Sequence, residues 1–154
     1  MTNREKYILS IYEELSDMGK HENVKLVKNT VNDGIYIKKT LKNYNIEIYK
    51  ILKNRQIKGI PKVYEIIEDE KELIIIEEYI HGLTLDKKYN KTDVETVKKI
   101  MEQLCNILKQ LHNMNPPIIH RDIKPTNIIV SNDDVVYLVD FNISREYDEN
   151  QSVD

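Results

Sequence analysis

The chain has 154 residues, with 23 lysines and arginines against 26 aspartates and glutamates, so its formal net charge is -3. This length suits one ordinary domain or two small lobes with a real core. The slight negative charge provides no global attraction to nucleic acid or to an anionic membrane, so we expect neither as a partner.

The cysteine content and the N-terminus indicate the compartment. A single cysteine, Cys105, excludes an internal disulfide and a site of several thiolates, which fits a reducing environment. Cys105 lies in an apolar pattern with helical spacing, so we expect it in the core. The first stretch, MTNREKYILSIYEEL, carries charges throughout and predicts neither a signal peptide nor a membrane span. The cytoplasm is the expected location.

The N-terminal part predicts strands and helices in a simple order. Apolar residues at helical spacing from Tyr7 to Leu15 indicate a short amphipathic first helix. Two strands then follow, around 24–26 and 35–37, and the Asn-Asp-Gly turn at 32–34 joins them as a hairpin. Residues 42–53 return to helical spacing.

Two apolar runs complete this part. KVYEIIED and ELIIIEEYI predict strands joined by a charged turn at 69–71. Residues 1–80 therefore predict a small antiparallel sheet with one helix against it. The break at 80–82 (Ile-His-Gly) is the expected hinge to a second lobe at 81–154.

The second part begins with the longest predicted helix, 92–112. Thr92 and Glu95 form the pattern of a capping box. Ile100 and Ile107 widen the apolar stripe of this helix, so we expect burial on more than one side. Strands at 128–130 and 135–140 follow. The main stripe consists of Val94, Val97, Met101, Leu104, Leu108 and Leu111.

Between the long helix and the last strand lies a dense polar motif. The loop 120–127 reads HRDIKPTN, and DFN begins at Asp140, 18 residues after Asp122. Such groups suit phosphoryl transfer, which needs an aligned nucleophile and neutralised phosphate charge. Asp122 is suited to accept or orient a hydroxyl proton, and Lys124 to offset charge on the γ-phosphate. Asn127 and Asp140 offer the hard oxygen ligands that Mg²⁺ prefers.

These motifs resemble the catalytic loop and the magnesium loop of eukaryotic-type serine/threonine protein kinases, which also occur in bacteria. The order of the predicted elements is also similar to that family. The resemblance implies a kinase-like α+β fold, with an N-terminal lobe of sheet and one helix and a mainly helical C-terminal lobe. It further implies ATP and Mg²⁺ as cofactors and a protein hydroxyl as the substrate.

The resemblance also implies an anchoring lysine for the phosphates on the third strand. Both Lys38 and Lys39 stand there, and we favour Lys39 because it shares a strand face with the aliphatic Ile37. The helix glutamate that pairs with this lysine in the family corresponds to Glu47.

The resemblance to the kinase family implies further nucleotide contacts. The family's glycine-rich loop would end at Val24, and Gly19 is the only glycine that matches its pattern. The hinge backbone at Glu78 and Ile80 is expected to bind adenine. Glu77 then stands at the back of the pocket, where a buried carboxylate is costly unless it is paired.

Two departures from the family pattern have physical consequences. Asn142 replaces the glycine after Asp-Phe, and asparagine is one of the few residues that tolerate a positive φ. The resemblance covers only about the first half to two thirds of a kinase domain. The helix 92–112 would then expose apolar surface, which predicts self-association or a complementary chain.

Three functions are consistent with these residues. The first is an ATP- and magnesium-dependent protein serine/threonine kinase. The second is a nucleotide-binding fragment or scaffold that transfers no phosphate. The third, a small-molecule kinase of the same fold, fits the Arg and Lys of HRDIKPTN less well.

Overall fold

The computed structural model describes residues 1–18, 23–89 and 93–147. The chain divides into two compact units. The first consists of Met1–Asn54 and Pro61–Tyr79, and the second of Arg55–Ile60 with the residues from Ile80 onward. The sequence had no feature that assigned 55–60 to the second unit.

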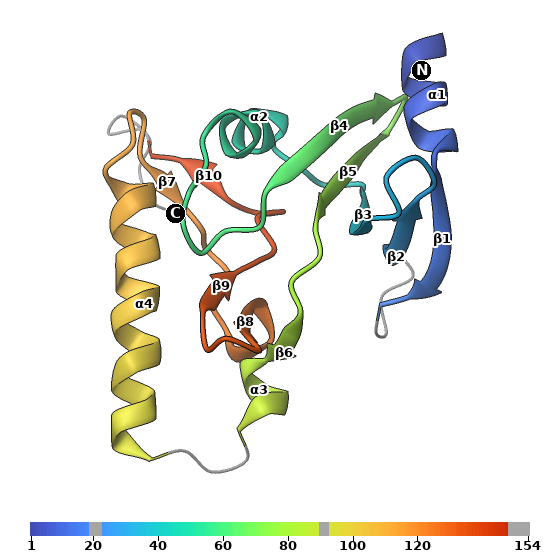
Figure 1. The fold of residues 1–154 in the computed structure, drawn as a ribbon. Helices are drawn as coiled ribbons and strands as arrows, with labels where there is room; N and C mark the ends of the chain where they lie inside the picture. Colours follow the sequence, from blue (N-terminus) through green and yellow to red (C-terminus); the bar gives the residue numbers. More distant parts are fainter. Residues whose placement is uncertain (19–22, 90–92, 148–154) are drawn as a thin grey trace. The chain divides into compact units, whose positions relative to one another are not determined.

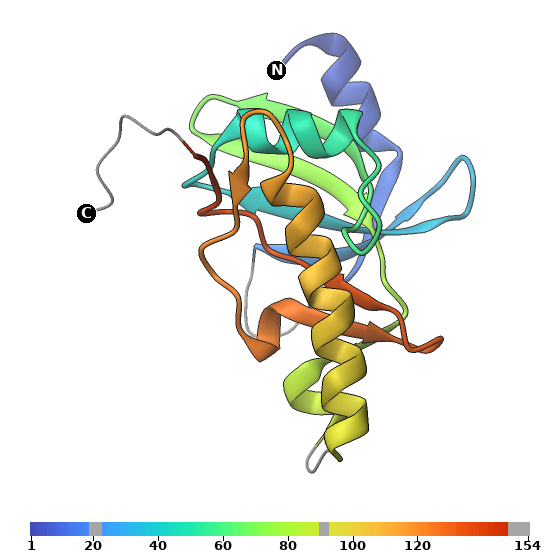
Figure 2. The same cartoon turned by 90° about the vertical axis from the view of Figure 1, so that its left-hand side faces the viewer.

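The first unit is a five-stranded antiparallel sheet with the strand order β1-β2-β3-β5-β4 (Figure 1). The helix α2 packs against β4 and buries one side in the core of this unit (Figure 2). The elements are α1 (Asn3–Ser10), β1 (Tyr12–Asp17), β2 (Val24–Asn29), β3 (Ile35–Leu41), α2 (Ile46–Asn54), β4 (Val63–Asp69) and β5 (Glu72–Glu78).

The predicted β2–β3 hairpin is confirmed. Lys28 lies opposite Ile35 in the register, and Asp33 in the turn has a φ of 58°. The side chain of Asn32 accepts a hydrogen bond from the backbone of Gly34, as an Asx turn requires. Local turn chemistry therefore sets the register of β3, and with it the face on which each of its lysines lies.

The register of β3 and β5 places two charged residues on one buried face of the sheet. Residues directly opposite each other in an antiparallel pair share a face. Ile37 lies opposite Glu77, and Lys39 lies opposite Ile75, so all four belong to the same face. Each of these four residues is buried.

Three tyrosines lie in a row across three strands of the first unit. The rings of Tyr12 and Tyr36 meet edge to face with centroids 5.6 Å apart, and those of Tyr36 and Tyr64 meet likewise at 5.0 Å. Edge-to-face pairs of this kind are worth about 0.5–1.5 kcal/mol beyond their burial. Tyr36 shares its face with Val27, its partner in the register, which is fully buried.

The predicted first helix is present, but its expected extent to Leu15 is wrong. The helix α1 is capped by Thr2 and ends at Ser10, and the chain continues as β1 from Tyr12. Tyr12 pairs with Asn29 of β2 and contacts Tyr36. Pairing with the sheet and the tyrosine contact therefore outweigh the helical spacing of a segment that has few apolar residues.

The second unit combines the long helix α4 with short strands. The strands β6, β8 and β9 form one antiparallel sheet, which Figure 1 shows beside α4, and β7 pairs with β10. A 3-10 turn at Pro125–Asn127 precedes β8. The elements are β6 (Gly82–Thr84), α3 (Leu85–Lys88), α4 (Val94–His112), β7 (Ile118–Ile119), β8 (Ile128–Ser131), β9 (Val136–Leu138) and β10 (Arg145–Glu146).

The N-terminus of α4 differs from the predicted capping box. The cap is Asp93, whose carboxylate accepts a hydrogen bond from the backbone of Thr96 at 2.9 Å. Glu95 lies in the first turn, and Thr92 lies outside the described residues. An aspartate at this position accepts a hydrogen bond from a backbone N–H that has no partner within the helix. Its negative charge is also stabilised by the positive end of the helix dipole.

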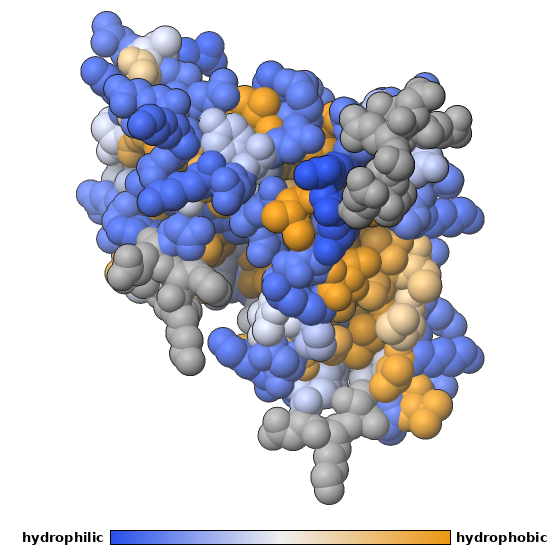
Figure 3. Space-filling view, turned by 180° about the vertical axis from the view of Figure 1, so that it is seen from behind, coloured by the Kyte–Doolittle hydropathy of each residue, from blue (hydrophilic) through white to orange (hydrophobic). Residues whose placement is uncertain are grey.

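Only part of the predicted apolar stripe of α4 is buried. The buried residues are Ile100, Leu104, Ile107 and Leu111. Val94, Val97 and Met101 are 85%, 46% and 50% exposed, and Cys105 is exposed as well, so its predicted place in the core is wrong. One side of the helix packs against the core. The other part of the stripe is exposed to solvent and forms an apolar surface (Figure 3).

Among the described residues, no helix combines the length and the apolar character that crossing a membrane requires.

The close approach of β6 to β8 requires a glycine at position 82. A Cβ at Gly82 would collide with the carbonyl oxygen of Val130 and lie 2.7 Å from the Cα of Ser131, and both obstacles are backbone atoms. We expect Gly82→Ala to reduce the free energy of unfolding by about 1–3 kcal/mol, as overpacking does. Urea denaturation would measure this. Leu83→Ala, at an exposed site in the same strand, is the control, and equal midpoints for both variants would contradict the prediction.

Candidate active site

The loop between β7 and β8 brings three predicted site residues together. Lys124 Nζ donates to Asp122 Oδ2 at 2.8 Å, and Asn127 Nδ2 donates to the same oxygen at 2.8 Å. Asn127 Nδ2 also donates to the backbone oxygen of Asp122 at 2.9 Å. Both amide hydrogens of Asn127 are thus used, so its amide oxygen is the group that it can offer to a metal ion. Oδ1 of Asp122 is the oxygen available for a hydroxyl.

The electrostatic environment of Asp122 favours its carboxylate form. The Lys124 ammonium holds the pKa of Asp122 below its ordinary value, partial burial acts in the opposite direction, and the Asn127 amide lowers the pKa further. The same contact raises the pKa of Lys124. A carboxylate with a lowered pKa is a weak base, so Asp122 is better suited to orient a hydroxyl than to remove its proton early.

His120 is the buried centre of this loop. Its ring is 1% exposed and lies edge to face with Phe141, with centroids 4.6 Å apart. The backbone N–H of Asp122 donates to Nδ1 of His120 at 3.2 Å, so Nε2 carries the hydrogen and donates to the Val139 oxygen at 3.0 Å. The imidazole therefore joins the catalytic loop to the segment that leads to Asp140.

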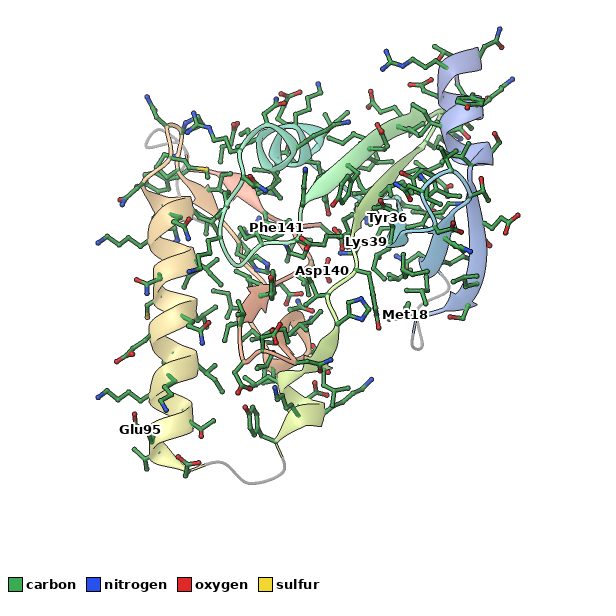
Figure 4. The ribbon with its side chains drawn as sticks, viewed as in Figure 1. Met18, Tyr36, Lys39, Glu95, Asp140 and Phe141 are labelled. Carbon is green, nitrogen blue, oxygen red and sulfur yellow. The ribbon has the colours of Figure 1, made fainter. Side chains whose placement is uncertain are left out.

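Asp140 and Phe141 follow β9 (Figure 4). Phe141 is buried. Oδ1 of Asp140 is also buried, and it has no hydrogen-bond partner among the described residues. A buried carboxylate oxygen without a partner is costly unless a cation satisfies it.

The residues of the second unit fit a hard divalent cation. Val139 N donates to the backbone oxygen of Asn127 at 3.0 Å, which ties the strand end before Asp140 to the other predicted ligand. In the described part of the chain, no group of three or more His, Cys, Asp or Glu is placed to hold a metal. A site of one carboxylate and one amide suits Mg²⁺, which completes its shell with water and substrate phosphate.

The backbone of the magnesium-loop motif departs from the prediction for Asn142. Asp140 has a φ of 69° and Arg121 a φ of 71°, whereas Asn142 is not among the residues with positive φ. The left-handed position thus falls on the aspartate itself. A non-glycine residue in this region costs free energy, which the surrounding contacts must offset.

In the first unit, the predicted pair of Lys39 with Glu47 is not formed. Lys39 Nζ lies 2.6 Å from Oε1 of Glu77, and both side chains are 10% exposed. Glu47, in the first turn of α2, pairs instead with Lys50 at 2.7 Å, and its side chain is 58% exposed. The sequence did place Glu77 where a buried carboxylate needs a partner, but it did not identify which lysine provides one.

Lys38 and Lys39 lie on opposite faces of β3. Lys38 contacts Glu14 of β1 at 2.9 Å, and its side chain is 23% exposed. Lys39 lies on the buried face with Ile37, and Val24 of β2 is its partner in the register (Figure 4). The alternation that the sequence predicted along β3 is confirmed.

The remaining predicted nucleotide contacts lie at the β1–β2 hairpin and at the end of β5. Met18 N donates to Val24 O at 2.9 Å, which closes the β1–β2 hairpin, while Gly19 within it lies outside the described residues. The backbone N–H of Glu78 donates to Lys62 O at 2.8 Å, so it is not free for adenine. Ile80, in the second unit, is 7% exposed.

One buried contact in the second unit had no signal in the sequence. Ser144 is 1% exposed, and its Oγ donates to the backbone oxygen of His120 at 3.0 Å. It thereby ties the chain beyond Asn142 to the catalytic loop. A serine in a polar stretch has no periodicity that predicts such burial.

The antiparallel sheet with α2 packed against it, followed in the chain by a long helix, a polar loop and a strand pair before Asp-Phe, defines a protein-kinase-like α+β fold. The solved kinase PK-1 of Cydia pomonella granulovirus has this fold, with a TM-score of 0.78, 21% identity, and coverage of 93% of this chain and 55% of that chain. Residues 12–154 match the family described as protein kinase domain. The chain belongs to this family, whose members use ATP and a divalent metal ion.

Curated relatives agree with this assignment. The serine/threonine-protein kinase PKH1 of Saccharomyces cerevisiae is 32% identical over 139 residues, which are 88% of this chain and 18% of that protein. Serine/threonine-protein kinase D of Synechocystis sp. is 38% identical over 88 residues, which are 56% of this chain and 17% of that protein. The chain thus spans less than a quarter of the length of these relatives.

The contact between Lys124 and Asp122 predicts a change in titration. In Lys124→Met the carboxylate loses the ammonium that lowers its pKa, so we expect the pKa of Asp122 to rise toward its ordinary value. The ¹³C shift of the Asp122 carboxyl carbon, followed by NMR against pH, would measure this. Lys98→Met, on the exposed side of α4, should leave the Asp122 midpoint unchanged. An unchanged midpoint in Lys124→Met would contradict the assignment.

Proposed function

We propose that the chain catalyses transfer of the γ-phosphate of ATP to serine and threonine hydroxyls of proteins, with Mg²⁺ as the metal. The observation that carries this proposal is the arrangement around Asp122, where Lys124 and Asn127 hold one carboxylate oxygen and leave the other available. Phosphoryl transfer requires mainly positioning and neutralisation of charge, which these residue types provide.

Five of the predicted site residues have roles in this proposal. Asp122 orients the accepting hydroxyl, and Lys124 offsets charge on the transferred phosphate. Asn127 and Asp140 hold the metal through oxygen atoms, which is supported by the buried Oδ1 of Asp140 that has no hydrogen-bond partner in the described part of the chain. Lys39 binds the phosphates of ATP, which is supported by its place on the same face as Ile37.

Adenine is proposed to bind near the side chains of Val24 and Ile37, because the backbone N–H of Glu78 already donates to Lys62. The cytoplasm is the proposed compartment, because it supplies ATP and because the chain has a single cysteine.

The proposal predicts that Asp122→Ala abolishes catalysis while the chain still binds nucleotide. We expect kcat for transfer of labelled γ-phosphate to a generic basic protein to fall by about 10²–10⁴-fold, the usual contribution of such a group. Binding of MgATP by calorimetry should change little, because Asp122 does not hold the nucleotide. Transfer that continues undiminished in Asp122→Ala would reject the assigned role.

A second candidate function is a nucleotide-binding regulatory or scaffold module without phosphoryl transfer. The observation that favours it is the exposed Glu47, which pairs with Lys50 and not with Lys39. The same assay separates the two functions. MgATP binding without any transfer by the unaltered chain would support the module over the enzyme.

The surface of α4 suggests an assembly. We define the α4 face as Val94, Val97, Met101 and Cys105, which follow one another at steps of three and four residues. In Figure 3 hydrophobic residues gather along this helix. Such spacing forms a seam that suits a second helix. Exposed apolar patches usually mark interaction sites.

We propose that a second copy of the chain covers the α4 face. The first turn of α4 is acidic through Glu95, and its last turn is basic through Lys109 and His112. Two copies of α4 packed antiparallel would bring the acidic end of each near the basic end of the other. A symmetric contact of this kind closes as a dimer.

Sedimentation equilibrium would test this assembly. We expect a dimer at micromolar concentrations that dissociates in Met101→Lys, because a charge in the centre of the seam is costly to bury. Gln110→Lys, at an exposed site on the same helix, is the control and should remain dimeric. A monomeric unaltered chain would reject self-association and leave a complementary chain as the partner.

A further inference from the structure

The ion pair of Lys39 and Glu77 is formed within a single sheet. Lys39 lies on β3 opposite Ile75, and Glu77 follows Ile75 by two residues on β5, so the two charged residues are diagonal neighbours on one face. Diagonal neighbours in an antiparallel sheet lie within reach of long side chains. Lys39 Nζ and Glu77 Oε1 are 2.6 Å apart, so the two side chains are in direct contact.

In the register of the described strands, no charged residue lies directly opposite either member of this pair. In the register, Val24 lies opposite Lys39 on β2, and Val63 lies opposite Glu77 on β4. Both neighbours are apolar, and both charged side chains are 10% exposed. A buried ammonium without a counter-charge is strongly unfavourable, so the contact with the Glu77 carboxylate is what holds the Lys39 side chain in place.

Glu47 is positioned differently. Its carboxylate is largely exposed and pairs with Lys50, one turn along the same helix. Exposed pairs at this spacing are weak. The helix glutamate that the family resemblance indicated therefore has a local partner, while the sheet provides the carboxylate that contacts Lys39.

We propose that Glu77 is the positioning residue for Lys39, in the role that the resemblance assigned to Glu47. This inference rests on the proposed function, in which Lys39 binds the phosphates of ATP. An ammonium has three donors, and one of them is directed to Glu77, so two remain for phosphate oxygens. Because both partners belong to one sheet, the orientation of Lys39 does not depend on the placement of α2.

A phosphate-specific binding experiment tests the role. Calorimetry measures the affinities for MgATP and for adenosine in the unaltered chain, in Glu77→Gln and in Glu47→Gln. Glu77→Gln keeps the shape and removes the charge, and we expect it to weaken MgATP binding by about tenfold or more, as loss of a charged hydrogen bond does. Adenosine lacks the phosphates, so its affinity should change by less than about twofold. A general structural defect would weaken both ligands together.

Two further variants sharpen the test. Glu65→Gln, which breaks the more exposed Lys53–Glu65 pair of the same unit, is the matched control and should leave both affinities unchanged. In a Lys39→Met background, adding Glu77→Gln should cause no further loss of MgATP affinity, because the group that Glu77 positions is already absent.

Thermal unfolding keeps the inference testable if a single variant folds poorly. Lys39→Met and Glu77→Gln each leave one buried charge without its partner, whereas the double variant leaves none. We therefore expect the double variant to melt at a higher temperature than either single variant. A melting temperature for the double variant as low as additivity of the two losses predicts would overturn the pairing.

Two binding results would also overturn the inference, and they are distinguishable. If the unaltered chain binds MgATP and Glu47→Gln loses that affinity while Glu77→Gln keeps it, the helix glutamate is the positioning residue. If the unaltered chain itself binds no MgATP, the proposed function fails, and the role of Glu77 toward phosphate fails with it.

Discussion

The buried imidazole of His120 connects the catalytic loop to the segment around Asp140 in the second unit. It accepts a hydrogen bond from the backbone of Asp122, donates one to Val139 and packs against Phe141. These contacts join the backbone at Asp122 to the segment that leads to Asp140. A histidine suits this task because one ring nitrogen can accept a hydrogen bond while the other donates one.

The charged residues of the two units are stabilised in different ways. Asp122 is partly exposed and is held by Lys124 and Asn127, so solvent and two donors share the stabilisation of one carboxylate. Lys39 and Glu77 are nearly excluded from water and depend on each other. Removing one partner should therefore lower the free energy of unfolding more for the Lys39–Glu77 pair than for the Lys124–Asp122 pair. A buried charge that is left alone cannot be stabilised by solvent.

Sequence patterns failed where local preference competed with contacts to other segments. The spacing from Tyr7 to Leu15 favours a helix, yet pairing with β2 makes Tyr12–Asp17 a strand. Cys105 fits an apolar stripe, yet the core contacts the neighbouring side of α4. Amphipathic spacing shows that a helix has apolar residues at regular intervals, but which of two adjacent stripes is buried depends on what packs against it.

The sequence alone determined the family, the β2–β3 hairpin and the residues of the catalytic loop, because these depend on short motifs, turn chemistry and alternation. The Asn-Asp-Gly turn sets the β2–β3 register, and alternation along β3 separates Lys38 from Lys39. Only the tertiary structure decided that Glu77 and not Glu47 pairs with Lys39, and that Ser144 contacts His120. Both contacts join residues that are far apart in the chain. Which residues meet depends on how the chain is buried, and local sequence patterns do not predict this.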